Sequence, residues 1–217
     1  MTPEPRVEAG DFSGVHVLVD DDPRWGADPV AQARRALAGG APVIQLRAKH
    51  ATDSQILSWA RAIRGETEQH GARFVVNDRF DLALAAGACA VHLGQEDLSP
   101  IDIPEAARRR LAIGRSTHTR EQIEAGVGER VDYLAFGPLF GTTSKLSVYP
   151  EQGFERLRDA VRAAAGIPVI AIGGILAAAI PALRASGVSG FAVISAVAGA
   201  DDPTAAARQL CDAWASS

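Results

Sequence analysis

Short runs of β-branched and other apolar residues recur along the chain, separated by alanine- and arginine-rich stretches with helical spacing. Continuous apolar runs of this length are typical of strands in a parallel sheet, where side chains point alternately to two covered faces. They predict eight strands, at 15–19, 43–46, 73–76, 90–93, 111–114, 133–136, 169–172 and 190–194.

The stretches between these strands predict helices at 28–37, 53–66, 78–86, 119–127, 153–165, 176–185 and 203–214, with a weaker helix at 103–110. Asp28, Asp53, Thr119 and Asp202 come at the start of these patterns, where a side-chain oxygen can accept from the free amides of the first turn. Strict strand–helix alternation through eight units favours an α/β fold of the closed (β/α)8 TIM-barrel type. An open doubly wound sheet remains the alternative.

The spacing of the elements also bears on domain organisation. A chain of 217 residues has room for two domains of roughly 100 residues, but the regular alternation favours one TIM-barrel catalytic domain over 13–217. Residues 1–12, which include Pro3 and Pro5, are predicted to form a flexible N-terminal tail.

Composition narrows the class of function. The chain carries 22 basic and 26 acidic residues, well mixed, with a net charge of −4, and this balance indicates neither nucleic-acid nor membrane binding. No signal segment or membrane-length apolar run occurs, which favours a cytoplasmic protein. Cys89 and Cys211 lie far apart and predict ordinary thiols. The sequence does not decide whether the protein forms a homo-oligomer.

Polar side chains gather where the second, third and fourth predicted strands end, which is where barrel active sites form. Strand alternation places Gln45, Arg47 and Lys49 on one side of the chain. Asp78 and Asp97 follow neighbouring strands and can converge as a partial shell for Mg²⁺, whose other oxygens come from water and substrate. Alternatively, Asp78 caps the next helix and Asp97 pairs with an arginine. His92 lacks a second histidine at ligand spacing and is interpreted as structural.

The later strand ends add hydroxyls, a lysine and glycines. Ser116 and Thr119 follow the fifth strand, and one of them is expected to cap a helix. The longest loop, 137–152, carries hydroxyls and Lys145, which together suit phosphate oxygens. Gly173 and Gly174 follow the seventh strand, at the common phosphate site of this fold.

Ordered segments along the whole predicted barrel resemble the thiamine-phosphate synthase family, which shares its fold with a thiazole tautomerase branch. The matching segments are QLRAK at 45–49, VVNDRFDLAL at 75–84, VHLGQEDL at 91–98, GRSTHT at 114–119, DYLAFGPLFGTTSK at 132–145, IPVIAIGGI at 167–175 and VISA at 193–196. The resemblance implies a Mg²⁺-dependent transferase of thiamine biosynthesis. Such an enzyme couples hydroxymethylpyrimidine pyrophosphate with thiazole phosphate through a dissociative carbocation mechanism, and releases pyrophosphate.

The same resemblance implies roles for individual residues. Asp78 and Asp97 would hold Mg²⁺, Gln45 would bind the pyrimidine, and Ser116 would lie near the leaving group. The pyrophosphate would be held by Arg47, Lys49, Asn77 and Lys145. The thiazole phosphate would be received by Thr142, Ser144, Gly174, Ile194 and Ser195. Lys145, Ser116, Arg47 and Lys49 would be the catalytic groups.

The chain also departs from the family pattern. Ala48 stands where an acidic residue is usual, Gly141 where proline is frequent and Ser144 where threonine is common, and 146–152 is an unfamiliar continuation. The synthase branch is favoured over a tautomerase-like paralogue, because that branch places a histidine after the sixth strand, where this chain has Pro138. A non-catalytic barrel that binds a thiamine precursor is a further alternative. A sugar-phosphate isomerase lacks support from the early strands.

Overall fold

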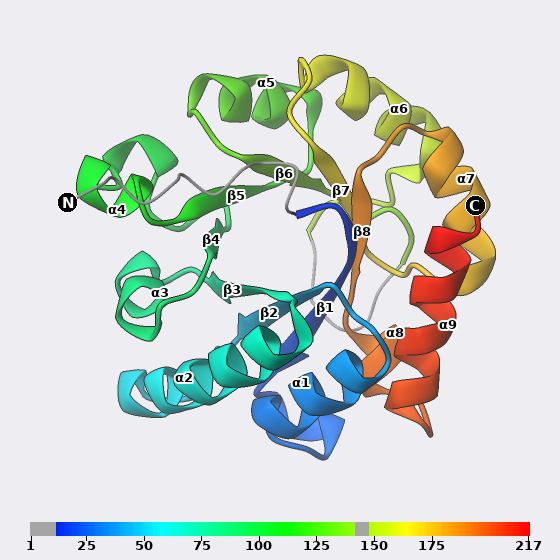
Figure 1. Cartoon of the computed structure of the whole chain (residues 1–217). Helices are drawn as coiled ribbons and strands as arrows, with labels where there is room; N and C mark the ends of the chain where they lie inside the picture. The colour runs from blue at the N-terminus through cyan, green and yellow to red at the C-terminus, as the bar shows by residue number, and fades with distance from the viewer. Residues whose placement is uncertain (1–11, 142–147) are drawn as a thin grey trace.

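Eight parallel strands close into a barrel in chain order, with β1 paired to both β2 and β8 (Figure 1). The computed structural model describes residues 12–141 and 148–217. The strands are β1 (Gly14–Asp20), β2 (Val43–Arg47), β3 (Arg73–Asn77), β4 (Ala90–Leu93), β5 (Ala112–Thr117), β6 (Tyr133–Phe136), β7 (Val169–Ile172) and β8 (Gly190–Val193). The predicted TIM barrel is confirmed.

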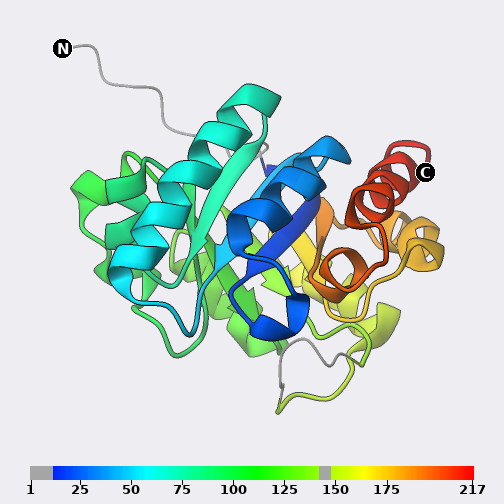
Figure 2. The same cartoon turned by 90° about the horizontal axis from the view of Figure 1, so that it is seen from below.

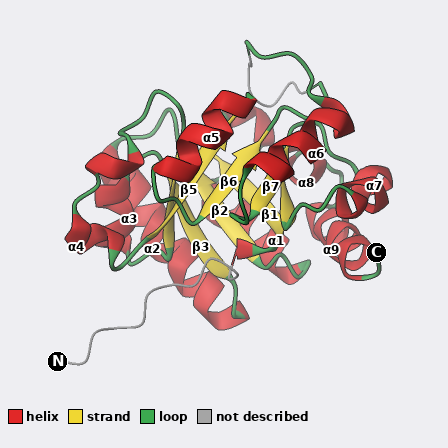
Figure 3. Ribbon diagram, turned by 90° about the horizontal axis from the view of Figure 1, so that it is seen from above, coloured by secondary structure: helices red, strands yellow, loops and turns green. Residues whose placement is uncertain are grey.

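Helices surround the barrel on its outside (Figure 3). They are α1 (Pro29–Ala38), α2 (Asp53–His70), α3 (Phe80–Ala86), α4 (Glu105–Arg108), α5 (Arg120–Gly128), α6 (Gly153–Ala163), α7 (Ile180–Ala185), α8 (Ser195–Ala198) and α9 (Pro203–Ala215), with short 3-10 turns η2 (Pro23–Trp25), η3 (Pro100–Asp102) and η4 (Ala177–Ala179). The first two helices lie side by side (Figure 2). No helix in the described part of the chain is long and apolar enough to cross a membrane.

Helix starts follow the predicted caps at three of four positions. Asp28, Thr119 and Asp202 accept first-turn amides of α1, α5 and α9. The prediction for Asp53 is wrong, because Thr52 caps α2 and forms a reciprocal capping box with Gln55. Asp53 instead occupies the first helical turn.

Strand alternation divides the apolar side chains into two layers. Residues such as Leu18, Val75 and Ile170 fill the barrel interior, while the alternate positions pack under the helices. Phe12 is fully buried in the interior and stacks on Tyr133, with ring centroids 5.3 Å apart. Phe12, the last residue of the predicted tail, therefore belongs to the barrel.

The fifth strand is longer than predicted and carries Ser116 inside the sheet rather than in the turn that follows. Gly114 and Ser116 face the barrel interior and Arg115 faces outward. A Cβ atom at Gly114 would lie 2.1 Å from Cζ of Tyr133, so glycine is required for the tyrosine ring to fit. The same inward side of β5 thus brings the Ser116 hydroxyl to the end of the barrel.

Candidate active site

A cavity of about 400 Å³ opens at the carboxyl ends of the strands, within the size range of small-molecule sites. All ten candidate site residues in the described part of the chain line it: Gln45, Arg47, Lys49, Asn77, Asp78, Asp97, Ser116, Gly174, Ile194 and Ser195. The remaining three, Thr142, Ser144 and Lys145, lie outside the described residues.

The end of β2 shows why alternation predicts this wall of the cavity. Gln45, Arg47 and Lys49 line the cavity, whereas Leu46 and Ala48 pack in the outer apolar layer under the helices. Gln45 is buried, and the two cations stand further toward the open end, where solvent reaches them. One amide and two positive charges therefore share one edge of the site.

Lys49 and the two candidate metal ligands form an electrostatic cluster. Lys49 Nζ donates to Asp78 Oδ2 at 2.5 Å, and Asp97 Oδ2 accepts the Gly94 N–H at 2.6 Å. Burial raises the pKa of Asp78, the Lys49 ammonium lowers it, and the neighbouring Asp97 carboxyl raises it again. The Asp78 carboxylate therefore lies next to both the Asp97 carboxyl and the Lys49 ammonium.

The backbone at Asp78 is unusual, with a φ of 67° in the left-handed region that residues with a Cβ atom rarely adopt. Its side chain does not cap α3, because that helix begins without a side-chain cap. The helix-cap alternative is therefore wrong. Two facing carboxylates that repel each other suit a cation such as Mg²⁺, which takes one or two carboxylates and completes its shell with water and phosphate oxygens.

Ser116 belongs to a hydrogen-bonded chain that continues into the barrel. His92 lies 2.9 Å from Ser116 Oγ through Nε2 and 3.1 Å from Tyr133 Oη through Nδ1, while Gln95 Nε2 donates to the Ser116 carbonyl at 2.5 Å. Burial raises the pKa of Tyr133, which keeps its hydroxyl protonated. His92, which also lines the cavity, therefore connects the Tyr133 hydroxyl to the hydroxyl of a candidate catalytic residue.

An aromatic pair that sequence reasoning missed forms another wall of the cavity. The rings of His118 and Tyr149 stack with centroids 4.1 Å apart and an interplanar angle of 15°. Gln122 links the two residues, because its Oε1 accepts the backbone N–H of His118 at 2.7 Å and its Nε2 donates to Tyr149 Oη at 3.2 Å. Tyr149 lies in the segment whose sequence departs from the family pattern.

The opposite wall is built from main chain. Gly173 and Gly174 have φ values of 105° and 64°, and a Cβ atom on Gly174 would lie 2.4 Å from the carbonyl oxygen of Gly141. Ile194 and Ser195 stand beside them at the start of α8, a short helix that the sequence pattern did not predict. Many barrels bind phosphate at this position, after the seventh and eighth strands.

The fold and the site define a TIM-barrel protein with a cationic, carboxylate-bearing site at one side of its cavity and a glycine-rich site at the other. A family model described as thiamine monophosphate synthase matches residues 15–197. The chain belongs to this family.

Individual relatives are similar in sequence to this chain over most of their length. A thiamine-phosphate synthase from Methanoculleus marisnigri is 43% identical over 198 residues, covering 91% of this chain and 93% of the relative. One from Chlorobium phaeovibrioides is 45% identical over 187 residues, covering 84% and 87%. The solved structure of a thiamine phosphate pyrophosphorylase from Pyrococcus furiosus is 35% identical, with a TM-score of 0.84, and covers 95% of this chain and 98% of that one.

Proposed function

We propose that this protein is a thiamine-phosphate synthase, a transferase that couples hydroxymethylpyrimidine pyrophosphate with thiazole phosphate and releases pyrophosphate. The observation that carries the proposal is the convergence of every described candidate residue on one cavity of about 400 Å³. These residues come from strand ends spread over most of the chain. Membership of the family and 40–45% identity to several thiamine-phosphate synthases support the same activity.

In this proposal the pyrophosphate binds beside Arg47, Lys49 and Asn77, with Mg²⁺ held by Asp78 and Asp97. The bound ion supplies positive charge that stabilises the departing pyrophosphate. Asn77 Oδ1 is buried without a hydrogen-bond partner among the described residues, and such an atom costs free energy unless a ligand satisfies it. Pyrophosphate oxygens could accept from Asn77 Nδ2, whereas Oδ1 would need a hydrogen-bond donor from the pyrimidine or from water.

The chain's own groups then have to orient two substrates and exclude water. In this proposal Gln45 binds the pyrimidine and Ser116 lies near the leaving group; both line the cavity, and Ser116 Oγ is hydrogen-bonded to His92. The carbon–oxygen bond to pyrophosphate breaks, and the thiazole nitrogen captures the resulting cation. Alignment of the acceptor matters more in such a reaction than a strong base. Gly174, Ile194 and Ser195 are placed to receive the thiazole phosphate, and Thr142, Ser144 and Lys145 keep their predicted roles.

The metal assignment is tested by Asp97→Asn and Asp78→Asn, with the exposed carboxylate variant Asp102→Asn as a matched control. Each site variant removes one oxygen ligand, so we expect turnover to fall about 100-fold or more and the half-saturating Mg²⁺ concentration to rise about tenfold. Asp102→Asn should match the unmodified chain. Normal turnover and Mg²⁺ dependence in both site variants would overturn the assignment. The cytoplasmic location and the oligomeric state stay predictions from the sequence.

A further inference from the structure

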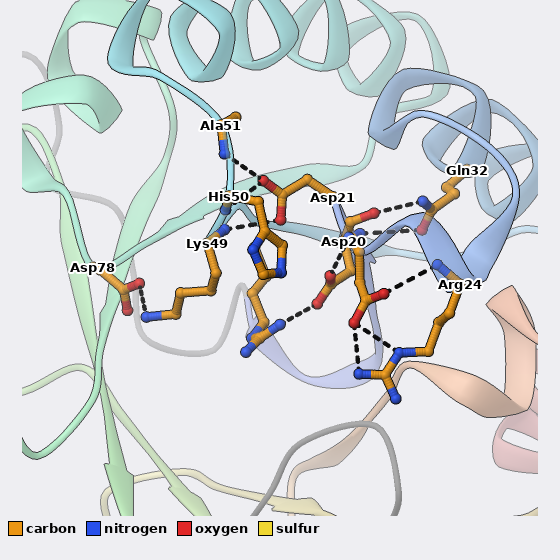
Figure 4. Close-up of polar contacts among 10 residues, drawn as sticks. Asp20, Asp21, Arg24, Gln32, Lys49, His50, Ala51 and Asp78 are labelled. Atoms are coloured by element: carbon orange, nitrogen blue, oxygen red, sulfur yellow. Dashed lines mark hydrogen bonds and ion pairs between the residues drawn. The ribbon is translucent and has the colours of Figure 1, made fainter.

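Asp20 is the last residue of β1, and Asp21 and Asp22 follow it directly. Asp20 and Asp21 lie beside the segment that carries Lys49 (Figure 4). None of the three aspartates is among the residues that line the cavity. Acidic groups next to a site for an anion oppose that anion electrostatically. The contacts of Asp20 and Asp21 explain why acidic residues lie next to the two cations.

Asp20 holds the guanidinium of Arg47. Its side chain is 1% exposed, and Oδ2 pairs with Arg47 Nη1, while the Arg47 side chain is 16% exposed. The backbone of Asp20 is itself fixed by Gln32 on α1: Asp20 N–H donates to Gln32 Oε1 at 3.1 Å, and Gln32 Nε2 donates to the Asp20 carbonyl at 2.7 Å. The carboxylate is therefore a fixed support for one face of the guanidinium.

Asp21 holds the turn that carries Lys49. Its carboxylate accepts three consecutive backbone N–H groups, from Lys49 at 2.9 Å and from His50 and Ala51 at 2.8 Å each. These amides precede α2 and have no helical partners of their own. Binding all three with one carboxylate fixes the main chain from which the Lys49 side chain reaches Asp78.

We propose that Asp20 and Asp21 are positioning residues that hold Arg47 and Lys49 in the geometry required by a metal-bound diphosphate. Burying an ion pair adds little stability, since desolvation offsets the attraction. Holding the two cations in place before the substrate arrives reduces the entropy lost on binding. This inference rests on the proposed function, because it takes the diphosphate as the ligand of Arg47 and Lys49.

The variants Asp20→Asn and Asp21→Asn distinguish a positioning role from a purely electrostatic effect of the two carboxylates. Each variant removes one negative charge near the site, so simple electrostatics predicts tighter binding of an anion. Positioning predicts the opposite, because an asparagine offers one acceptor oxygen in place of two. Asp20 uses one oxygen for the Arg47 guanidinium and the other for the Asp22 N–H, and Asp21 uses both for its three backbone donors. Asp22→Asn is the matched control: it removes the same charge from the next residue, whose side chain binds Arg24 at the exposed turn η2.

The experiment measures kcat and KM for both substrates, and titrates the full chain with pyrophosphate in excess Mg²⁺ by calorimetry. We expect both site variants to weaken Mg²⁺–pyrophosphate binding and to raise KM for the pyrimidine substrate about tenfold, the scale on which supporting residues act. KM for thiazole phosphate and all constants of Asp22→Asn should change less than about twofold. A loss shared by both substrates would indicate a general structural defect and overturn the proposal.

Double-mutant cycles then identify the residues through which the aspartates act. Asp20→Asn should have no further effect on pyrophosphate binding in an Arg47→Ala background, and Asp21→Asn none in a Lys49→Ala background. Additive losses, or pyrophosphate binding as tight as or tighter than that of the unmodified chain, would overturn the proposal. If Asp20→Asn does not fold, Asp20→Glu keeps the charge but displaces the guanidinium, and should give the same selective loss.

The calorimetric comparison does not depend on turnover. If the unmodified chain made no thiamine phosphate, the proposed function would fail, yet weaker Mg²⁺–pyrophosphate binding in both variants would still support positioning. A normal KM for the pyrimidine substrate and normal Mg²⁺–pyrophosphate binding in every variant would instead leave the function intact and reject the positioning role.

Discussion

The ammonium of Lys49 lies 2.5 Å from a carboxylate oxygen of Asp78, so a residue proposed to bind pyrophosphate is paired with one proposed to bind Mg²⁺. If Asp78 holds Mg²⁺ as proposed, the metal and the Lys49 ammonium would compete to neutralise the negative charge of this carboxylate, and phosphate oxygens would be further partners for the ammonium. The ion pair therefore links the proposed metal site to the proposed pyrophosphate site.

Lys49→Met should change the affinities for metal and for metal-bound pyrophosphate in opposite directions. Without the ammonium, the charges of Asp78 and Asp97 are uncompensated, so Mg²⁺ alone should bind about three- to tenfold more tightly. Mg²⁺–pyrophosphate should bind at least about tenfold more weakly, because a phosphate partner is lost. Calorimetric titrations measure both affinities. Arg34→Gln is the control, because the Arg34 guanidinium pairs with Glu66. Weaker binding of Mg²⁺ alone would contradict this picture.

The stacked pair of His118 and Tyr149 should matter through its shape rather than through the tyrosine hydroxyl. Tyr149→Phe keeps the ring that covers His118 and should retain kcat/KM within about threefold. Tyr149→Ala removes a wall of the cavity and a stacking contact worth about 0.5–1.5 kcal/mol, so kcat/KM should fall about tenfold. Steady-state kinetics on both variants provides the measurement. Equal losses in the two variants would assign the effect to the Gln122 hydrogen bond instead.

His16 should make the protein less stable in mild acid. Burial lowers its pKa to about 4, although its hydrogen bond with the Phe12 carbonyl acts in the opposite direction. The unfolded chain takes up a proton near pH 6.5 and the folded chain does not, so stability is full above pH 6.5 and falls as the pH drops toward 4. The loss from this group reaches about 3 kcal/mol.

Urea unfolding at several pH values between 7 and 4.5 tests the effect, with His16→Gln as the comparison. The carboxylates titrate in both proteins, so the difference between the two curves isolates the histidine. The unmodified chain should lose stability more steeply below pH 6.5. Parallel curves would show that His16 is protonated in the folded protein as easily as in the unfolded one.

The strand ends were predictable because a period of two decides which side chains point inward. That rule alone places Gln45, Arg47 and Lys49 on the cavity side of the chain, and the order of parallel strands brings Asp78 and Asp97 together. Both inferences need only local geometry and the direction of the chain.

Contacts between distant segments were not predictable in this way. The pairing of Asp20 with Arg47 and the stacking of Tyr149 on His118 depend on how separate loops meet over the barrel. No periodic pattern in the sequence predicts these contacts. Phe12 was predicted to belong to a flexible tail because the residue that it stacks on, Tyr133, lies far along the sequence. Thr52, rather than Asp53, caps α2 because it forms reciprocal hydrogen bonds with Gln55. A helical pattern in the sequence does not locate the start of a helix to within one residue.

The most direct test of the central claim is to mix hydroxymethylpyrimidine pyrophosphate, thiazole phosphate and the purified chain with Mg²⁺, and to follow thiamine phosphate and pyrophosphate together. A thiamine-phosphate synthase should give equal amounts of both products, lose both when a chelator removes the metal, and recover when Mg²⁺ is added in excess. A reaction that yields no thiamine phosphate, but isomerises the thiazole phosphate whether or not the chelator is present, would contradict that claim.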